Sequence, residues 1–342
     1  MIFARSNTAL RQPEKQFRFI FVINLGQLGD VILSLPALRA IRNRFPDAYI
    51  VTMTGKIPGE VVRMSATADE VLAIDRVALR DGPRVRSIIE ILSLVRQIRK
   101  LPIDLVIDLH SLPETNMLAF LTRAKHRLLA DRESRSINWL GNYKPAPPKE
   151  NKALHLTDRY LDVLTPLGVD NQDRSIKLVS SLPGEIAAIE EKLALRSGQR
   201  VGIFPGAGHP SRCWSLDKFA ELAHRIEKQG ANPVIFLGPE EASMKGKLIS
   251  IFTSGVTIID GLSISQFVTA MGSLDAFVSN DTGPVHLAAC SGVPIILLLD
   301  ERAPVTYLPL SDQVDVIRNS TIDDISVDDV FHSVNRVLEA SR

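Results

Sequence analysis

Residues 278–298 place polar side chains at the point where an apolar run meets a predicted helix. The stretch reads VSNDTGPVHLAACSGVPIILL, and its turn carries Asp281, Thr282, Gly283 and His286. A helix that begins near Thr282 directs unpaired N–H groups and the positive end of its dipole outward, which suits an anion such as a diphosphate. Gly283 permits close approach, the Thr282 hydroxyl can donate, and His286 can donate from one turn further on.

A simpler interpretation of this turn stays open. Asp281 or Thr282 would then only cap the helix, and His286 would be a core imidazole with no ligand. Because a carboxylate aimed at a diphosphate would repel it, Asp281 is better suited to capping the helix or to holding a sugar or ribose hydroxyl.

A second turn, residues 204–219, reads FPGAGHPSRCWSLDKF. Its small residues Gly206, Ala207 and Gly208 expose backbone N–H groups, and Arg212 adds a fixed positive charge. The combination suits an anionic ligand. The alternative is a surface loop in which the arginine is incidental.

A third turn, residues 24–30, reads NLGQLGD and leads from an apolar run into a helical pattern. Gly26 and Gly29 permit close backbone approach, and Asp30 lies where the helix starts, a position at which aspartate often only caps. The glycine spacing lacks the second interval of the G-x-G-x-x-G dinucleotide motif. This turn by itself therefore does not indicate a dinucleotide site.

Apolar runs alternate with helical patterns along the whole chain. The runs fall at 19–24, 48–53, 70–74, 104–109, 126–130, 200–204, 233–237, 256–260, 276–279 and 294–299. The helical patterns fall at 29–44, 87–99, 153–167, 215–229, 240–250, 264–272, from 284 onward and near 327–340. This order predicts an α/β protein with parallel sheets covered on both faces. Ligands of such sheets bind beyond the carboxyl ends of the strands, which is where all three turns lie.

Length and composition narrow the class of protein. The 342 residues predict two domains of roughly 150 residues each. With 40 basic and 39 acidic residues the chain is no typical nucleic-acid binder, and Cys213 and Cys290 cannot form a disulfide framework or a zinc site. The longest apolar run, 293–299, is far shorter than the roughly 20 residues that span a bilayer, and the start of the chain lacks a signal-peptide core. We therefore expect a cytoplasmic protein.

Four stretches in order resemble glycosyltransferase family 9, the lipopolysaccharide heptosyltransferases. They are LGDVILSLPALRAIRNRFPDAYI, DLVIDLHS, FPGAGHPSRCWSLDKFAELAHRI and NDTGPVHLAACSGVPIILL. The resemblance implies the GT-B architecture, in which two Rossmann-like domains face each other across a cleft. Residues 1–172 would bind the acceptor, residues 173–325 would bind the nucleotide-sugar, and residues 326–342 would form a helix that returns toward the first domain.

The resemblance also implies roles for single residues. Asp30 matches the catalytic base, and Arg212 matches a basic position two residues before the tryptophan, where lysine is common in the family. Thr282, Gly283 and His286 match donor-diphosphate positions, and Asp281 matches the acid that precedes them. The acid near the nucleoside ribose matches Glu241, with Glu240 as the alternative.

The implied reaction is inverting transfer of a heptose or related sugar from a nucleoside-diphosphate sugar, ADP-heptose in the family, to a lipid-linked saccharide of the lipopolysaccharide-core type. The donor-binding set includes the loop residues Gly206, Ala207 and Gly208, and the leaving diphosphate would be stabilised by Arg212 and the helix end. No D-x-D motif follows a strand, so we expect no metal and no other cofactor. A GT-B nucleotide-sugar epimerase and a catalytically silent nucleotide-sugar-binding protein are the alternatives.

The acceptor side is less sharply indicated. Residues 122–144 contain a basic excess that includes Arg123 and Arg127, which could meet carboxylates or phosphates of the acceptor. A solvated basic surface is the other interpretation. We predict that Gly29, Arg123 and Arg127 bind the acceptor, and that the chain contacts the cytoplasmic face of the inner membrane peripherally.

Overall fold

The computed structural model describes residues 16–75, 84–169, 173–176, 198–241, 245–252 and 256–340, with residues 178, 187, 189, 191 and 193 between them. The predicted domain boundary at residues 172 and 173 borders a segment, 170–172, that lies outside this part of the chain. The start of the chain, in which no signal-peptide core was expected, also lies outside it up to residue 15.

The first domain is built on five parallel strands in the order β3-β2-β1-β4-β5. The strands are β1 (Phe19–Ile23), β2 (Tyr49–Gly55), β3 (Glu70–Ile74), β4 (Leu105–Asp108) and β5 (His126–Leu129). The helices are α1 (Leu28–Arg44), α2 (Lys56–Met64), α4 (Arg84–Ile98), α5 (Pro113–Leu121) and α6 (Leu156–Val163), with short 3₁₀ helices η1 (Asn138–Leu140) and η2 (Thr165–Leu167). Ile23 pairs with Met53 and with Asp108, so the carboxyl ends of β1 and β4 lie at one edge of the sheet.

The second domain is built on six parallel strands in the order β11-β10-β9-β6-β7-β8. The strands are β6 (Arg200–Phe204), β7 (Asn232–Leu237), β8 (Thr257–Asp260), β9 (Ala276–Asn280), β10 (Ile295–Asp300) and β11 (Val314–Asn319). The helices are α8 (Leu216–Lys228), α9 (Lys245–Ile251), α10 (Ile264–Met271), α11 (Gly283–Ser291) and α12 (Val327–Ala340), with 3₁₀ helices η3 (Pro210–Arg212), η5 (Val305–Tyr307) and η6 (Ile322–Asp324). Counted from β6, this is the Rossmann order.

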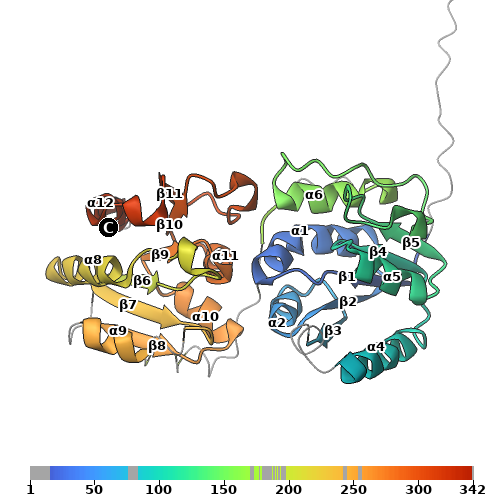
Figure 1. The fold of residues 1–342 in the computed structure, drawn as a ribbon, viewed down its shortest axis with the longest axis horizontal. Helices are drawn as coiled ribbons and strands as arrows, with labels where there is room; N and C mark the ends of the chain where they lie inside the picture. The colour runs from blue at the N-terminus through green and yellow to red at the C-terminus, as the bar shows by residue number, and fades with distance from the viewer. Residues whose placement is uncertain are drawn as a thin grey trace, which may run out of the picture.

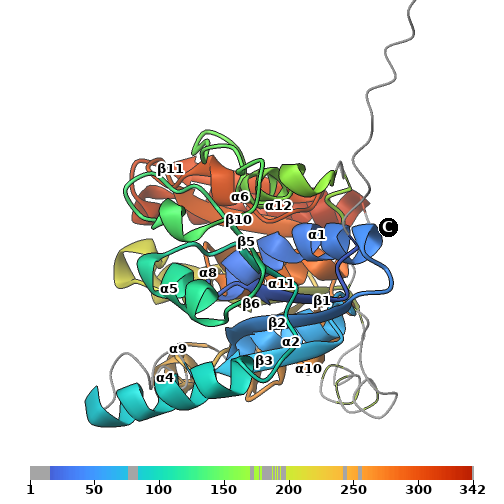
Figure 2. The ribbon, with the colours of Figure 1, turned by 90° about the vertical axis from the view of Figure 1, so that its right-hand side faces the viewer.

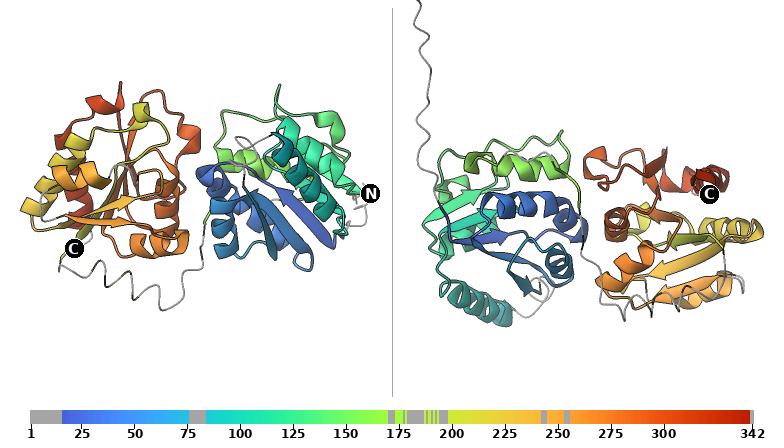
Figure 3. Two further views of the ribbon diagram at one scale, coloured as in Figure 1. Left: turned by 60° about the horizontal axis from the view of Figure 1, so that its bottom comes forward. Right: turned by 180° about the vertical axis from the view of Figure 1, so that it is seen from behind.

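Helices cover both faces of each sheet, as the apolar strands require (Figures 1 and 3). In the first domain, α4 and α5 cover one face around Phe21, and α1, α2 and α6 cover the other around Val22. The cluster around Val22 continues into the second domain through α10 and α11. The two domains therefore share an apolar interface in which α1 packs on α11 and α2 packs on α10.

The predicted fold class is confirmed, but the helices α2 and α5 were not predicted. The edge strand β11 was not predicted, because each of its residues is only half-buried and charged residues interrupt its apolar ones. In the described part of the chain, no helix combines the length and apolarity that crossing a bilayer needs.

The last helix was predicted to return toward the first domain. In the structure, helix α12 packs on α8 and on strands β9, β10 and β11 of the second domain (Figure 1). The reason is its apolar face, since Val330, Val334 and Leu338 are buried in the cluster that contains Trp214.

This packing predicts the effect of shortening one buried side chain of α12. Leu338→Ala should lower the free energy of unfolding of the second domain by roughly 2–5 kcal/mol, because it opens a cavity in that cluster. Glu339→Ala, one residue on and exposed, is the matched control and should change it little. Equal effects of the two substitutions in urea unfolding would show that α12 is not docked there.

Candidate functional site

The turn between β1 and α1 holds Asp30 in a fixed position. Asn24 Oδ1 accepts a hydrogen bond from the Gly26 N–H at 3.0 Å, and Asp30 Oδ2 accepts one from the Gln27 N–H, also at 3.0 Å. A β-carbon at position 26 would lie 2.6 Å from Asp30 Cβ, so the turn requires glycine there. Asp30 thus does cap the helix with one carboxylate oxygen. Within the described residues, no hydrogen bond involves its other oxygen, Oδ1.

The turn between β9 and α11 is not closed by its own side chains. Thr282 is the N-cap residue, yet its hydroxyl makes no capping bond. The Val285 N–H donates to the Thr282 carbonyl, and Pro284 has no N–H. The Gly283 N–H has no acceptor among the described residues. The simple capping role for Thr282 is therefore not what the structure has, and donors at this helix end remain available to an anion.

The first turns of α1 and α11 lie against each other although they belong to different domains. A β-carbon at Gly29 would lie 2.8 Å from His286 Cδ2, and one at Gly283 would lie 3.0 Å from Leu28 Cδ2. Both glycines therefore permit an approach that a side chain would obstruct. Because Asp30 follows Gly29 and Thr282 precedes Gly283, this contact brings the two predicted sites to one junction.

His286 lies inside that junction. The residue is 6% exposed, and its Nδ1 is buried without a partner among the described residues. Burial, helped by the nearby charge of His155, lowers the pKa of His286 to about 4. The imidazole is therefore neutral near pH 7, so any contact with a diphosphate would be a hydrogen bond and not an ion pair.

The loop after β6 is tied to the end of β9 by Asn280. Its Nδ2 donates to the carbonyls of Pro205 and Gly206 at 2.9 and 3.2 Å, and its Oδ1 accepts from the Trp214 N–H at 3.1 Å. The Trp214 ring is fully buried and donates from Nε1 to the Ile325 carbonyl. Both ends of the loop that contains Arg212 are thus fixed. This role of Asn280 was not predicted, although its position directly after an apolar strand was a signal.

Arg212 lies beside Asp281 within this arrangement. The two side chains are 3.8 Å apart from Nη1 to Oδ2, and the arginine side chain is 59% exposed. Burial raises the pKa of Asp281, with Arg212 opposing the shift and Asp300 adding to it. Arg212 is thus placed next to the turn that carries Thr282 and has an exposed guanidinium with which to meet a ligand.

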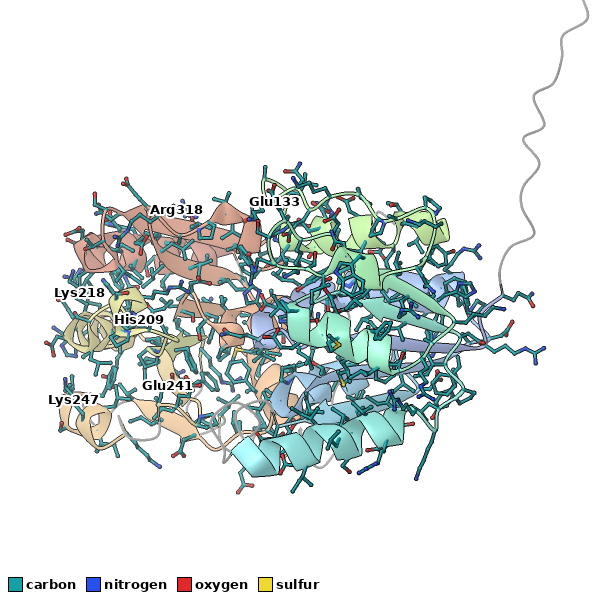
Figure 4. The ribbon with its side chains drawn as sticks, turned by 45° about the vertical axis from the view of Figure 1, so that its right-hand side comes forward. Glu133, His209, Lys218, Glu241, Lys247 and Arg318 are labelled. Carbon is teal, nitrogen blue, oxygen red and sulfur yellow. The ribbon has the colours of Figure 1, made fainter. Side chains whose placement is uncertain are left out.

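Glu241 lies against the small-residue loop, and its neighbour Glu240 does not. Its carboxylate accepts from the Gly238 N–H at 3.1 Å, and a β-carbon at Gly206 would lie 2.1 Å from Glu241 Oε1. Burial raises the pKa of Glu241, while Glu240 is exposed. Glu241 and His209 both belong to the second domain (Figure 4). Of the two acids left open by the sequence, the structure brings Glu241 to the predicted donor loop.

The three small residues of this loop differ in exposure. Gly206 is buried, Ala207 is half-buried and Gly208 is exposed.

Two further features of the first domain were not predicted. A small pocket beyond the ends of β4 and β5 is lined by Leu109, Ala130, Arg132, Glu150, Arg159 and Tyr160. Burial raises the pKa of Tyr160, and so does the charge of Asp30, which places this pocket near the predicted base. Arg132 and Arg159 share the single carboxylate of Glu150, at 3.7 and 3.3 Å.

The second feature is a buried polar network at the end of β4. Asp108 accepts from the Ser111 N–H at 2.7 Å and from Asn116 Nδ2 at 2.8 Å. Burial raises the pKa of Asp108 to about 6, although these hydrogen bonds act in the opposite direction. The network fixes the turn that leads into α5. No pattern in the sequence pointed to it, since Asp108 reads as part of an apolar strand.

The structure does not bring Arg123 and Arg127 together with Asp30. They precede and begin β5, whereas Asp30 follows the carboxyl end of β1, at the opposite edge of the parallel sheet. Arg127 donates to the carbonyls of Leu140 and Ala124, each at 2.9 Å. Direct contact between these arginines and a reacting acceptor hydroxyl is therefore disfavoured. Of the predicted acceptor residues, only Gly29 lies at the junction.

Two Rossmann-type sheets whose strand-end turns meet at one junction define the GT-B architecture. The family model of glycosyltransferase family 9 (heptosyltransferase) matches residues 91–330, and the chain belongs to this family. Lipopolysaccharide heptosyltransferase 3 of Escherichia coli K12 is 23% identical over 299 residues, which covers 84% of this chain and 83% of the relative.

Solved structures of the same architecture cover nearly the whole chain. A family 9 glycosyltransferase from Veillonella parvula matches with a TM-score of 0.83 and 22% identity, over 96% of this chain and 99% of that one. The E. coli ADP-heptose lipopolysaccharide heptosyltransferase II matches with a TM-score of 0.78 and 20% identity, over 94% and 99%. The resemblance seen in the sequence is thus confirmed, and the fold is that of heptosyltransferases.

The contact between Gly29 and His286 can be tested by whether Gly29→Ala stabilises or destabilises the protein. In an unobstructed helix, glycine to alanine stabilises by up to about 1 kcal/mol. Here Gly29→Ala should instead lower the free energy of unfolding by roughly 1–3 kcal/mol, because the new methyl group meets the imidazole. In a His286→Ala background the same change should become neutral or stabilising. A Gly29→Ala effect of the same size in both backgrounds, measured by urea unfolding, would disprove the contact.

The buried imidazole also predicts a pH dependence. The folded pKa of His286 is about 4 and the ordinary value is 6.5, so the unfolded chain takes up the proton first as pH falls. The contribution of the neutral His286 to the free energy of unfolding is complete above pH 6.5 and is lost as pH falls toward 4. As pH rises through this window, the free energy of unfolding of the wild type should increase relative to that of His286→Gln by up to about 1.4 kcal/mol per pH unit.

His286→Gln is the reference because Asp108 has the opposite effect over a similar pH range. The folded chain binds the Asp108 proton first, so this group adds stability as pH falls. Unfolding free energies of the two proteins that stay parallel from pH 4 to 6.5 would show that His286 is not buried in a neutral form.

Proposed function

We propose that the chain is an inverting transferase that moves a heptose or related sugar from a nucleoside-diphosphate sugar to a saccharide of the lipopolysaccharide-core type. The contact between the first turns of α1 and α11 carries this proposal, because it sets the candidate base beside the candidate diphosphate site. ADP-heptose is the proposed donor, since the E. coli structural relative is an ADP-heptose lipopolysaccharide heptosyltransferase.

Asp30 is the general base of the proposal. Its Oδ2 is held by the Gln27 N–H, which leaves Oδ1 for the proton of the attacking hydroxyl. The dipole of α1 stabilises a negative charge at this position. An aspartate is a weak base, but the hydroxyl becomes acidic as its bond to an oxocarbenium-like centre forms, so the proton can transfer late.

The leaving diphosphate is assigned to the start of α11. The Gly283 N–H and the Thr282 hydroxyl are donors left unused by capping, and Arg212 lies next to them beside Asp281. Together they meet the charge that grows as the bond to the sugar breaks. The proposal needs no metal ion for this step. Glu241, on the Gly206 loop, is assigned to the hydroxyls of the donor ribose.

The pocket with two arginines is assigned to the acceptor. Arg159 is 7% exposed and stacks 4.9 Å from the centre of the Tyr307 ring, while its Nε and Nη2 are buried without a hydrogen-bond partner among the described residues. Arg132 and Arg159 share the carboxylate of Glu150, and Asp131 and Asp162 also line the pocket, so carboxylates match the charge of its arginines. The unused Nε and Nη2 donors of Arg159 therefore suit an oxygen of the acceptor saccharide, with the attacking hydroxyl directed toward Asp30.

Replacing the base should separate catalysis from binding. Asp30→Asn keeps an oxygen that can accept from the Gln27 N–H but removes the basic site. We expect turnover to fall by roughly 100-fold or more, with the affinity for ADP nearly unchanged. Steady-state kinetics and ADP titration check both. Turnover close to that of the wild type would reduce Asp30 to a helix cap.

The diphosphate assignment is tested by comparing ADP with adenosine. Thr282→Val and Arg212→Ala should each weaken ADP binding by about tenfold to a hundredfold, the scale of one lost hydrogen bond to a charged oxygen. Adenosine binding should change little, because adenosine has no group that reaches the start of α11. Calorimetric titration that finds equal weakening for both ligands, or none for either, would place the diphosphate elsewhere.

A further inference from the structure

The outer surface of the first domain exposes large apolar side chains that belong to neighbouring elements. Trp139 of η1 is 81% exposed, and Phe120 and Met117 of α5 are 45% and 44% exposed. On α4, Ile89 and Leu92 are 61% and 49% exposed, and their spacing of three residues puts them on one face of the helix. We call this set, with the basic residues described below, the α4–α5 surface. Single exposed apolar residues are common, whereas a group of this size indicates a binding surface.

Contacts between the elements show that these residues lie on one side of the molecule. The Arg127 guanidinium stacks 5.4 Å above the Phe120 ring and donates to the Leu140 carbonyl, next to Trp139. Arg99 Nε donates to the Leu121 carbonyl at 2.8 Å, which joins the ends of α4 and α5. The inner residues of both helices pack in the same cluster, so their outer faces point away from the same face of the sheet (Figure 2).

Basic side chains border the apolar group. Arg96 and Lys100 lie at the end of α4, and Arg123 and Lys125 lie in the turn after α5. All four are exposed, and none forms an ion pair with a carboxylate in the ranges that the structure describes. The acids of the two helices lie elsewhere along them, Glu114 in the first turn of α5 and Glu90 well before Arg96 on α4.

We propose that the α4–α5 surface binds an anionic lipid bilayer. Trp139 and Phe120 would enter the interfacial layer, where amphipathic aromatic rings are favoured, and the basic side chains would meet the phosphate groups. The positive charge of the four bordering basic residues favours an anionic bilayer over a neutral one. This inference rests on the proposed function in one respect: membrane binding would hold the enzyme close to a lipid-linked acceptor.

The surface also reaches the edge of the sheet that carries the candidate site. The Ile137 N–H, two residues before Trp139, donates to Asn116 Oδ1, and Asn116 in turn donates to Asp108 at the carboxyl end of β4. Asp30 follows the carboxyl end of the adjacent strand β1. A bilayer under the surface would therefore lie beside that edge, from which a saccharide chain can extend toward Asp30.

The chain contains a convenient reporter. It has two tryptophans, of which Trp214 is fully buried and Trp139 is exposed, so changes in emission on binding vesicles come from Trp139. The full chain should show a blue shift and protection from a soluble quencher with phosphatidylglycerol vesicles. The effect should weaken with added salt and be much smaller with phosphatidylcholine vesicles.

Co-sedimentation with phosphatidylglycerol vesicles tests the surface residue by residue. Lys125→Gln and Arg96→Gln should each weaken binding about fivefold, from roughly 1 kcal/mol for each basic residue near an anionic surface. Trp139→Ser should weaken it at least as much. Lys247→Gln and Ile249→Ser on α9 of the second domain, where Ile249 is 58% exposed, are matched controls that should bind as the wild type does.

Three outcomes would overturn the proposal: equal binding to both kinds of vesicle, equal losses in the α9 controls, or a Trp139 shift that follows protein concentration without vesicles. The last would show that the surface pairs two copies of the chain. Transfer to a water-soluble acceptor should be unchanged in Trp139→Ser. Loss of vesicle binding with transfer intact therefore separates failure of this inference from failure of the proposed function.

Discussion

The close contact between the first turns of α1 and α11 is the constraint on which the candidate site depends. Gly29 leaves room for the His286 ring, and Gly283 leaves room for the Leu28 side chain. Neither domain has a complete site alone, because Asp30 belongs to the first and Thr282 to the second. An apolar cluster that runs through both domains holds the contact, and it also removes the imidazole from water.

Much of the fold follows from local patterns in the sequence. Strands β1 to β10 are short apolar runs, and parallel sheets place the turns after them at the carboxyl edges. The sequence therefore indicates where to look for chemistry before any tertiary contact is known. It could not show that Asp30 both caps α1 and keeps one oxygen available, or that Thr282 leaves its helix uncapped, because these depend on the exact geometry of each turn.

What the sequence could not predict depends on contacts between distant residues. The edge strand β11 pairs with β10 but lacks a continuous apolar run, and α12 takes its position from the cluster around Trp214. Arg127 looked available to an acceptor, but its Nε and Nη1 donate to carbonyls of its own region. The choice between Glu240 and Glu241 required the structure, in which the loop that carries Gly206 contacts Glu241.

In the proposed mechanism, the donor diphosphate binds at the start of α11, within reach of the base on α1. A crystal structure of the chain with ADP and an acceptor saccharide tests this most directly. We predict a diphosphate oxygen about 3 Å from the Gly283 nitrogen, the Arg212 guanidinium on the same group, and an acceptor hydroxyl at Asp30. A diphosphate bound with Gly283 and Thr282 both beyond hydrogen-bond distance would contradict it.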